Sequence, residues 1–206
     1  MSTEDLPRPP SFASAPRRTG APEGDIEVHV ADEQDEVDVD VERLAGLAHS
    51  SLVSEGVRGD VELGVLVVDE PTMADLNLQH MGEHGPTDVL AFPIGDEYIA
   101  AGRNPEAGPR GPTTREPLST PGPLLLGDVV LCPAVARRNA PLHAGSFPGH
   151  VGELTDELDL LVVHGMLHVL GHDHATDEER EAMRAKEREL LSAYRDRHPP
   201  PGGSRS

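Results

Sequence analysis

The segment HGMLHVLGHDH, residues 164–174, contains four of the 11 histidines in the chain. His164 and His168 are four residues apart, so on a helix both imidazoles lie on one face, as two ligands of the same metal ion must. Gly171 then offers a helix stop, because glycine readily adopts the left-handed backbone conformation that turns the chain back. This turn can aim His174 at the same point, so the segment predicts a metal site built from three imidazoles.

His172 competes with His174 for the third position, because it continues the same helical stripe if the helix runs on. Gly171 and Asp173 both disfavour a further helical turn, which favours His174. Three imidazoles with an open fourth position are the ligand set of a catalytic zinc, whereas a structural zinc usually closes that position with cysteine. Cys132 is the only cysteine, so we expect one catalytic Zn²⁺ per chain.

The same segment resembles the H-G-x-L-H-x-x-G-x-D-H signature of the YbeY family of bacterial rRNA maturation factors. The segment PTDVLAFP, residues 86–93, is similar to the family's P-T-D-V-L-S-F-P, with Ala91 in place of serine. A weaker match is GDVV at residues 127–130, and the resemblance spans roughly residues 25–195. In the family the position of His172 is usually tyrosine, so a histidine here is a departure that could compete for metal. The signature matches at His164, Gly165, Leu167, His168, Gly171, Asp173 and His174.

The resemblance implies a metal-dependent endoribonuclease that cleaves single-stranded RNA, with His164, His168 and His174 as the metal ligands. It implies a role in rRNA maturation, particularly at the 3′ end of the small-subunit rRNA, and in ribosome quality control. The partners implied are rRNA, the small ribosomal subunit and its proteins, and an assembly GTPase. The family fold is α+β, a small sheet packed with helices around the metal cleft.

One position departs from the family in a way that bears on catalysis. The family often has an arginine after L-N-x-x-Y, and the aligned segment LNLQHM ends in Met81. If that arginine stabilises phosphate charge in the family, this chain must use another donor. The departure leaves a second hypothesis, in which the protein is a non-catalytic, metal-stabilised ribosome assembly factor.

The three ligands alone do not choose between hydrolysis of an amide and of a phosphodiester, because zinc activates water for both. Zinc proteases of the H-E-x-x-H type place a glutamate directly after the first histidine as general base, and here that residue is Gly165. This difference makes a zinc metalloprotease the less favoured alternative. The nearest acids are Asp128 and Asp173, and we expect Asp173 to hold a histidine tautomer. No catalytic residue is assigned beyond the metal ligands.

The chain carries 37 acidic against 17 basic residues, a formal net charge of −20. Nucleic-acid binders usually present a basic face, because contacts with phosphates supply most of their affinity. The charge balance therefore argues against strong autonomous RNA binding unless the fold gathers a local basic patch.

Cysteine content and hydropathy bear on the compartment. A single cysteine excludes an intrachain disulfide and suits a reducing compartment. The N-terminal region lacks the apolar core of a signal peptide, and no segment offers about 20 consecutive apolar residues for a membrane span. We therefore expect a soluble cytoplasmic protein with no membrane partner.

We expect an α+β fold in which a small mixed β-sheet packs with helices. A single domain over residues 25–196 lies between polar tails at 1–24 and 197–206, and a Gly- and Pro-rich insertion interrupts it at about 95–123. The helix over about 152–170 is apolar almost all round, so we expect it to be buried at the centre and to carry the metal histidines. Residue patterns predict strands at 26–30, 61–69, 87–94 and 124–131, and helices at 39–57, 69–81, 152–170 and 176–194.

Other candidate residues receive weaker interpretations. His80 and His84 have the i, i+4 spacing of a metal pair, but Gly82 and Gly85 break the helix at this point. His49 is interpreted as a solvated or partly buried helix residue. The insertion contains three candidate phosphate-contacting arginines, although a solvated connector is favoured; they are Arg103, Arg110 and Arg115.

Overall fold

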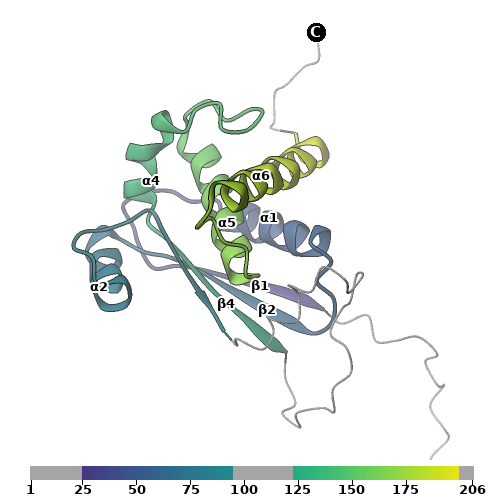
Figure 1. The fold of residues 1–206 in the computed structure, drawn as a ribbon. Helices are drawn as coiled ribbons and strands as arrows, with labels where there is room; N and C mark the ends of the chain where they lie inside the picture. Colours follow the sequence, from purple (N-terminus) through teal and green to yellow (C-terminus); the bar gives the residue numbers. More distant parts are fainter. Residues whose placement is uncertain (1–24, 95–122, 200–206) are drawn as a thin grey trace, which may run out of the picture.

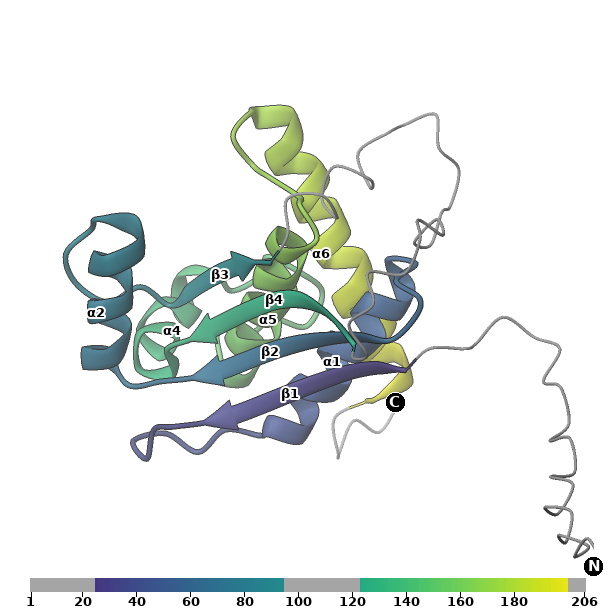
Figure 2. The ribbon, with the colours of Figure 1, turned by 90° about the horizontal axis from the view of Figure 1, so that it is seen from below.

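Four strands form a mixed β-sheet: β1 (Ile26–Asp32), β2 (Val61–Val67), β3 (Val89–Pro93) and β4 (Leu124–Leu131). The strand order is β1-β2-β4-β3, with β1, β2 and β4 parallel and β3 antiparallel to β4 (Figure 2). Together with the helices that pack on it, this sheet confirms the predicted α+β class.

The computed structural model describes residues 25–94 and 123–199. The predicted tail at 1–24 and the predicted insertion at about 95–123 lie outside these ranges, apart from residue 123. So do residues 200–206 of the second predicted tail. The three arginines of the insertion, Arg103, Arg110 and Arg115, therefore have no described position.

Three helices lie in two layers over one face of the sheet: α1 (Val41–Ser54), α5 (Leu154–Val169) and α6 (Asp177–Arg197) (Figure 1). α1 packs on β1, and α5 packs on β3 and β4, while α6 packs across both helices. α5 therefore lies between the sheet and α6. Its position explains why apolar residues surround it, and the predicted central, buried helix is confirmed.

Strand alternation decides which side chains meet these helices. In β2, Val61, Leu63, Val65 and Val67 are buried, and the first three belong to the core under α1 and α5. The residues between them are only partly buried on the other face. This period of two is what the sequence of β2 predicts for a strand whose two faces differ.

Local capping explains where several helices begin and end. α2 (Glu70–Met81) lies at the end of the sheet, begins at a cap by the Asp69 side chain and ends at Gly82, whose φ is 73°. α6 begins with the predicted capping box between Thr176 and Glu179. α6 continues to Arg197 rather than ending near 194, so the helix includes the first residue of the predicted tail.

The sequence prediction missed one helix. α4 (Pro133–Asn139) and the 3-10 turn η1 (Ala140–Leu142) occupy a segment predicted as a plain connection. Seven residues are too few to show helical periodicity, so the sequence pattern gives no signal for this short helix, which packs against α5. Arg138 of α4 also pairs with Glu70 of α2.

A buried ion pair joins α1 to α5. Arg43 donates to both carboxylate oxygens of Asp159, which is 1% exposed. Burial raises the pKa of Asp159, and the bond to Arg43 opposes that rise. The pair explains how an acid is accommodated in the apolar run of α5. Over the two described ranges, no helix is long and apolar enough to cross a membrane.

Candidate metal centre

Three imidazoles meet at the C-terminal end of α5. His164 and His168 lie one turn apart, and their ring centroids are 4.7 Å apart. The ring centroid of His174 lies 5.7 Å from that of His164 and 4.9 Å from that of His168. One ring nitrogen from each residue lies within 4.8 Å of the others, so the group could hold a metal ion. The structure thus brings the three predicted ligands together.

The turn that returns His174 to the helix is built around Gly171. Gly171 has a φ of 87°, in the left-handed region that strains residues with a Cβ. The N–H of Gly171 donates to the His168 carbonyl, and the N–H of His172 donates to the Leu167 carbonyl, both at 2.9 Å. These two bonds are the Schellman motif that ends many helices at a glycine. The predicted helix stop is therefore confirmed.

Each of the two helical imidazoles has its Nδ1 atom bonded to an acceptor. His164 Nδ1 donates to Glu187 Oε1 at 2.8 Å, and His168 Nδ1 donates to the His172 carbonyl at 3.0 Å. Because an ionised carboxylate and a carbonyl only accept, the protons sit on Nδ1 and each Nε2 keeps a lone pair. The two Nε2 atoms lie 3.2 Å apart. Two facing lone pairs repel each other unless a cation is shared between them, so this donor set fits a metal ion.

The surroundings of His168 favour its neutral form. Burial lowers the pKa of His168, and the neighbouring His164 and His174 lower it further. The bond to the His172 carbonyl and the charge of Asp173 raise the pKa by less. Since a metal binds the neutral imidazole, the net downward shift prepares His168 as a ligand.

His172 lies outside the cluster. Its Nε2 atom lies 3.4 Å from Glu55 Oε2, just beyond the C-terminal end of α1. Lys186 of α6 lies 3.2 Å from the other oxygen of the same carboxylate. In this arrangement the His172 side chain contacts the Glu55–Lys186 ion pair, while its carbonyl orients His168. His174 rather than His172 completes the cluster.

Glu187 is a residue of the site that the sequence reasoning missed. It is 8% exposed and lies on α6, 23 residues after the histidine that it orients. The signal was present in the sequence, because Glu187 stands on the same helical stripe as the buried Met183, Leu190 and Leu191. An acid in an apolar stripe needs a partner, but only the packing of α6 on α5 identifies that partner as His164.

The two acids that the sequence singled out have other positions. Asp173 accepts from the backbone N–H of His174 at 2.7 Å, and in the described ranges its carboxylate has no hydrogen bond to an imidazole. The expectation that Asp173 holds a tautomer is therefore wrong, and Glu187 has that role. Asp128 follows Gly127 in β4, and its carboxylate covers Gly64 of β2. Because strand residues alternate, Asp128 faces away from α5.

Gly165, directly after the first ligand, has no room for a side chain. A Cβ there would lie 2.6 Å from Val129 Cγ1 and 3.3 Å from Val89 Cγ2. Glycine therefore lets α5 approach the sheet closely. The glutamate of an H-E-x-x-H protease cannot occupy this position without moving the helix, which weighs against the metalloprotease alternative.

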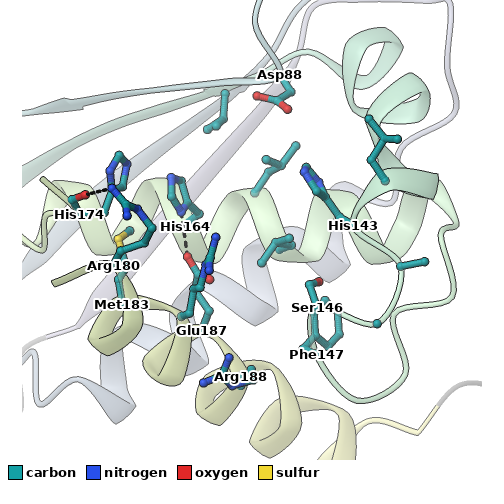
Figure 3. Close-up of a pocket in the computed structure, with 17 residues that line it drawn as sticks. Asp88, His143, Ser146, Phe147, His164, His174, Arg180, Met183, Glu187 and Arg188 are labelled. Carbon is teal, nitrogen blue, oxygen red and sulfur yellow. Dashed lines mark hydrogen bonds and ion pairs between the residues drawn. The ribbon is translucent and has the colours of Figure 1, made fainter. Parts of the chain in front are cut away.

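Two cavities meet at the cluster. The larger has a volume of about 710 Å³ and extends between α6 and residues 142–147 (Figure 3). The smaller, of about 480 Å³, lies on the other side, beside Met81 and β3. His164 and His174 line both cavities. Three arginines of α6 line the larger cavity, namely Arg180, Arg184 and Arg188.

The remaining candidate histidines lie on α1 and near the end of α2. His80 packs edge-on against Phe92, with ring centroids 4.8 Å apart, and Gly82 ends α2 before His84. His49 is exposed on α1. No described group of three or more potential ligands includes any of these histidines.

Comparison with known proteins gives a consistent result. A family model described as Endoribonuclease YbeY matches residues 29–195. A protein named Endoribonuclease YbeY from Frankia casuarinae is 45% identical over 166 residues, which cover 80% of this chain and 73% of that protein. The protein of the same name from Thermobifida fusca is 44% identical over 172 residues, which cover 82% and 95%. A solution structure from Thermotoga maritima is 23% identical, covers 87% of this chain and 99% of that chain, and has a TM-score of 0.47.

Proposed function

The chain belongs to the YbeY family of endoribonucleases, hydrolases of RNA, and from this premise we propose that it is a zinc-dependent nuclease of single-stranded RNA. Its role in the cell is maturation of rRNA, at the 3′ end of the small-subunit rRNA, and ribosome quality control. The expected location is the cytoplasm, where ribosomes mature. The observation that carries the proposal is the convergence of three imidazoles, two of them with Nδ1 already bonded, at the wall of an arginine-lined cavity.

We propose His164, His168 and His174 as the ligands of one Zn²⁺ per chain. Three neutral nitrogen ligands suit zinc, and because the described residues add no fourth ligand to this group, the site can accept water or substrate. When bound, zinc supplies a Lewis acid that acidifies water and polarises a phosphoryl oxygen. Glu187 and the His172 carbonyl fix the orientation of two of the rings. Such bonds also keep the ring protons away from the metal-facing nitrogens.

The cavity wall favours RNA over a peptide as substrate. Arg180, Arg184 and Arg188 can neutralise phosphates, which compensates locally for the net charge of −20. Asp88 also lines this cavity, across α5 from the arginines (Figure 3), and Asn139 donates to its Oδ2 at 2.8 Å. Its fixed carboxylate is available to accept a hydrogen bond from a sugar hydroxyl.

The proposal is tested with zinc-loaded protein and a labelled single-stranded RNA. We expect the wild type to cleave the RNA and His168→Ala to leave it at the level of a no-protein control. His49→Ala is the matched control, because it removes an exposed imidazole on α1 and should cleave like the wild type. Circular dichroism and metal analysis establish that each variant is folded and how much zinc it holds. Cleavage by His168→Ala equal to the wild type would contradict a metal-centred reaction.

The cellular role needs a separate measurement. In a bacterial host lacking its own family member, the wild type should restore the mature small-subunit 3′ end, and His168→Ala should leave extended precursors. Co-purification with the small subunit, its proteins or an assembly GTPase tests the proposed partners. If both versions restore maturation equally, the nuclease role in the cell is wrong.

A second candidate function is a metal-stabilised ribosome assembly factor without catalysis. Met81 favours it, because the side chain at the position where the family often has arginine is apolar and 51% exposed beside the cluster. In that case zinc-loaded wild type binds metal stoichiometrically and cleaves no RNA. His168→Ala then lowers thermal stability and zinc content only.

A further inference from the structure

Positive charge lies on one side of the histidine cluster. The larger cavity has three arginines on its α6 wall, spaced one turn apart. Among the residues that line the smaller cavity in the described part of the chain, none is arginine or lysine. In a chain with a net charge of −20, this separation marks one side for an anionic ligand.

The arginines are available to such a ligand. Arg184 is exposed, and over residues 25–94 and 123–199 it makes no hydrogen bond or ion pair. Arg188 lies 3.0 Å from Glu181, and Arg180 pairs with Asp177. Both acids have mostly exposed side chains, 67% and 97%. Exposed pairs of this kind contribute little to stability, so a phosphate can replace either acid.

The opposite wall has a different chemistry. His143 Nδ1 lies 2.7 Å from Glu157 Oε1, and its side chain is 42% exposed at the rim of the cavity. Glu157 is fully buried in α5 and also accepts from His150 Nε2 at 3.0 Å, so its position is fixed from two sides. Leu142, next to His143, is 80% exposed and lines the same cavity. This wall presents a held ring and an apolar side chain rather than charge.

Both walls line one cavity along α5, with His143 nearer the start of that helix and the arginines nearer the histidine cluster (Figure 3). α6 runs antiparallel to α5, since Glu187 bonds His164 while Arg195, further along α6, bonds Asp156 near the start of α5. The arginine row therefore lies beside the histidine cluster, from Arg180, which donates to the His174 carbonyl at 3.3 Å, to Arg188, which follows Glu187 and is the arginine nearest the His143 end of the cavity. Its first and last members are eight residue steps apart, about 12 Å along α6, and His164 lies about 10 Å along α5 from Glu157, the residue that bonds His143.

We propose that this groove is a one-sided track for single-stranded RNA, holding the nucleotides on only one side of the scissile phosphate. The α6 arginines contact successive phosphates, and His143 with Leu142 contacts bases. Proteins that bind single strands combine a positively charged groove with stacking surfaces in this way. An acidic protein segment could use the arginines but has no bases for the opposite wall. The inference rests on the proposed function and adds the place and direction of the substrate.

The test uses the double variant Arg184→Gln/Arg188→Gln, which leaves Glu187 and the histidines in place. We expect its zinc content and melting temperature to match the wild type. Its Kd for a single-stranded RNA oligonucleotide should rise about tenfold at 0.1 M salt, because two phosphate contacts are lost. The slope of log Kd against log salt should fall by about 1.4. The control is Arg137→Gln/Arg197→Gln, which removes the same charge from two exposed positions outside the cavity.

The outcomes separate the track from the function. If the wild type cleaves RNA and the double variant keeps the wild-type Kd and salt slope, the track is wrong and the proposed nuclease stands. If the wild type neither binds nor cleaves RNA, both fail. If the control weakens binding as much as the double variant, general charge rather than the groove is responsible, and the track is overturned. An equal loss of affinity for polyglutamate and for RNA would assign the groove to acidic protein instead.

Direction is tested with oligonucleotides extended from the cleavage site at one end only. Extension at one end should lower the wild-type KM, and the double variant should lose that benefit. Extension at the other end should leave KM unchanged. Equal benefit from both ends would overturn the one-sided track.

Discussion

The two sides of the histidine cluster are built by different means. On the α6 side, polar residues surround the cluster: Glu187 orients His164, and arginines line the cavity beyond. On the β3 side the wall is made by packing, with Gly165 pressed against the sheet and Met81 exposed at the edge. The comparison shows that hydrogen bonding from α6 orients the imidazole of His164, while close packing on the sheet holds the helix that carries it in place. Under the proposed function, substrate recognition and the orientation of the metal ligands depend on α6, and the rigidity of the site depends on the sheet.

The largest effect should come from removing the polar support of the α6 side. Glu187→Ala leaves His164 Nδ1 without its acceptor, so the ring loses its fixed orientation. We expect zinc affinity to fall about 10- to 100-fold, measured by competition with a chromogenic chelator. Glu187→Gln should lose less, because its amide oxygen still accepts from Nδ1. The matched control is Glu189→Ala, an exposed acid on α6, and an equal loss there would mean that the effect is general.

A smaller effect should follow from making the β3 side basic. Met81→Arg places a positive charge beside the cluster on the side that lacks one. We expect RNA affinity to increase about fivefold at 0.1 M salt and the salt slope to rise by about 0.7. Met81→Gln is the control for the loss of the apolar side chain. If Met81→Arg changes neither Kd nor kcat, nucleotides do not occupy this side of the cluster even when it carries a positive charge. The difference between the two sides in RNA binding would then have a cause other than charge.

The smallest effect should come from the rim opposite the arginines. His143→Ala removes a ring that can stack on a base, so we expect KM for RNA to rise about two- to threefold with zinc content unchanged. The expected rise is small because the ring is partly exposed, and a buried ring contributes more to stacking. His143→Phe keeps a ring and should restore KM, although Glu157 then loses one of its two histidine partners. Melting temperatures of both variants separate this loss from RNA binding. If His143→Ala keeps the wild-type KM, the wall formed by Leu142 and His143 does not contact RNA.

Several elements were predictable because their signals are local. The strands, the capping box at Thr176 and the helix stop at Gly171 depend on neighbouring residues, and the structure has all of them. The helix α4 was missed because seven residues carry no periodic signal. The assignment of a tautomer-holding role to Asp173 failed for a related reason. Closeness in sequence suggested it, whereas the actual acceptor comes from another helix.

The sequence by itself determined the candidate metal ligands and the family. The relation between His164, His168 and His174 is set by one helical turn and one glycine, within 11 residues, so it needs no distant contact. Only the tertiary structure decided which residues serve this cluster. Glu187 and the arginine row reach the cavity because α6 packs antiparallel on α5, and the ring of His143 lies at the same cavity because the buried Glu157 of α5 bonds it. Those positions depend on side-chain packing between elements, which residue spacing along the chain does not encode.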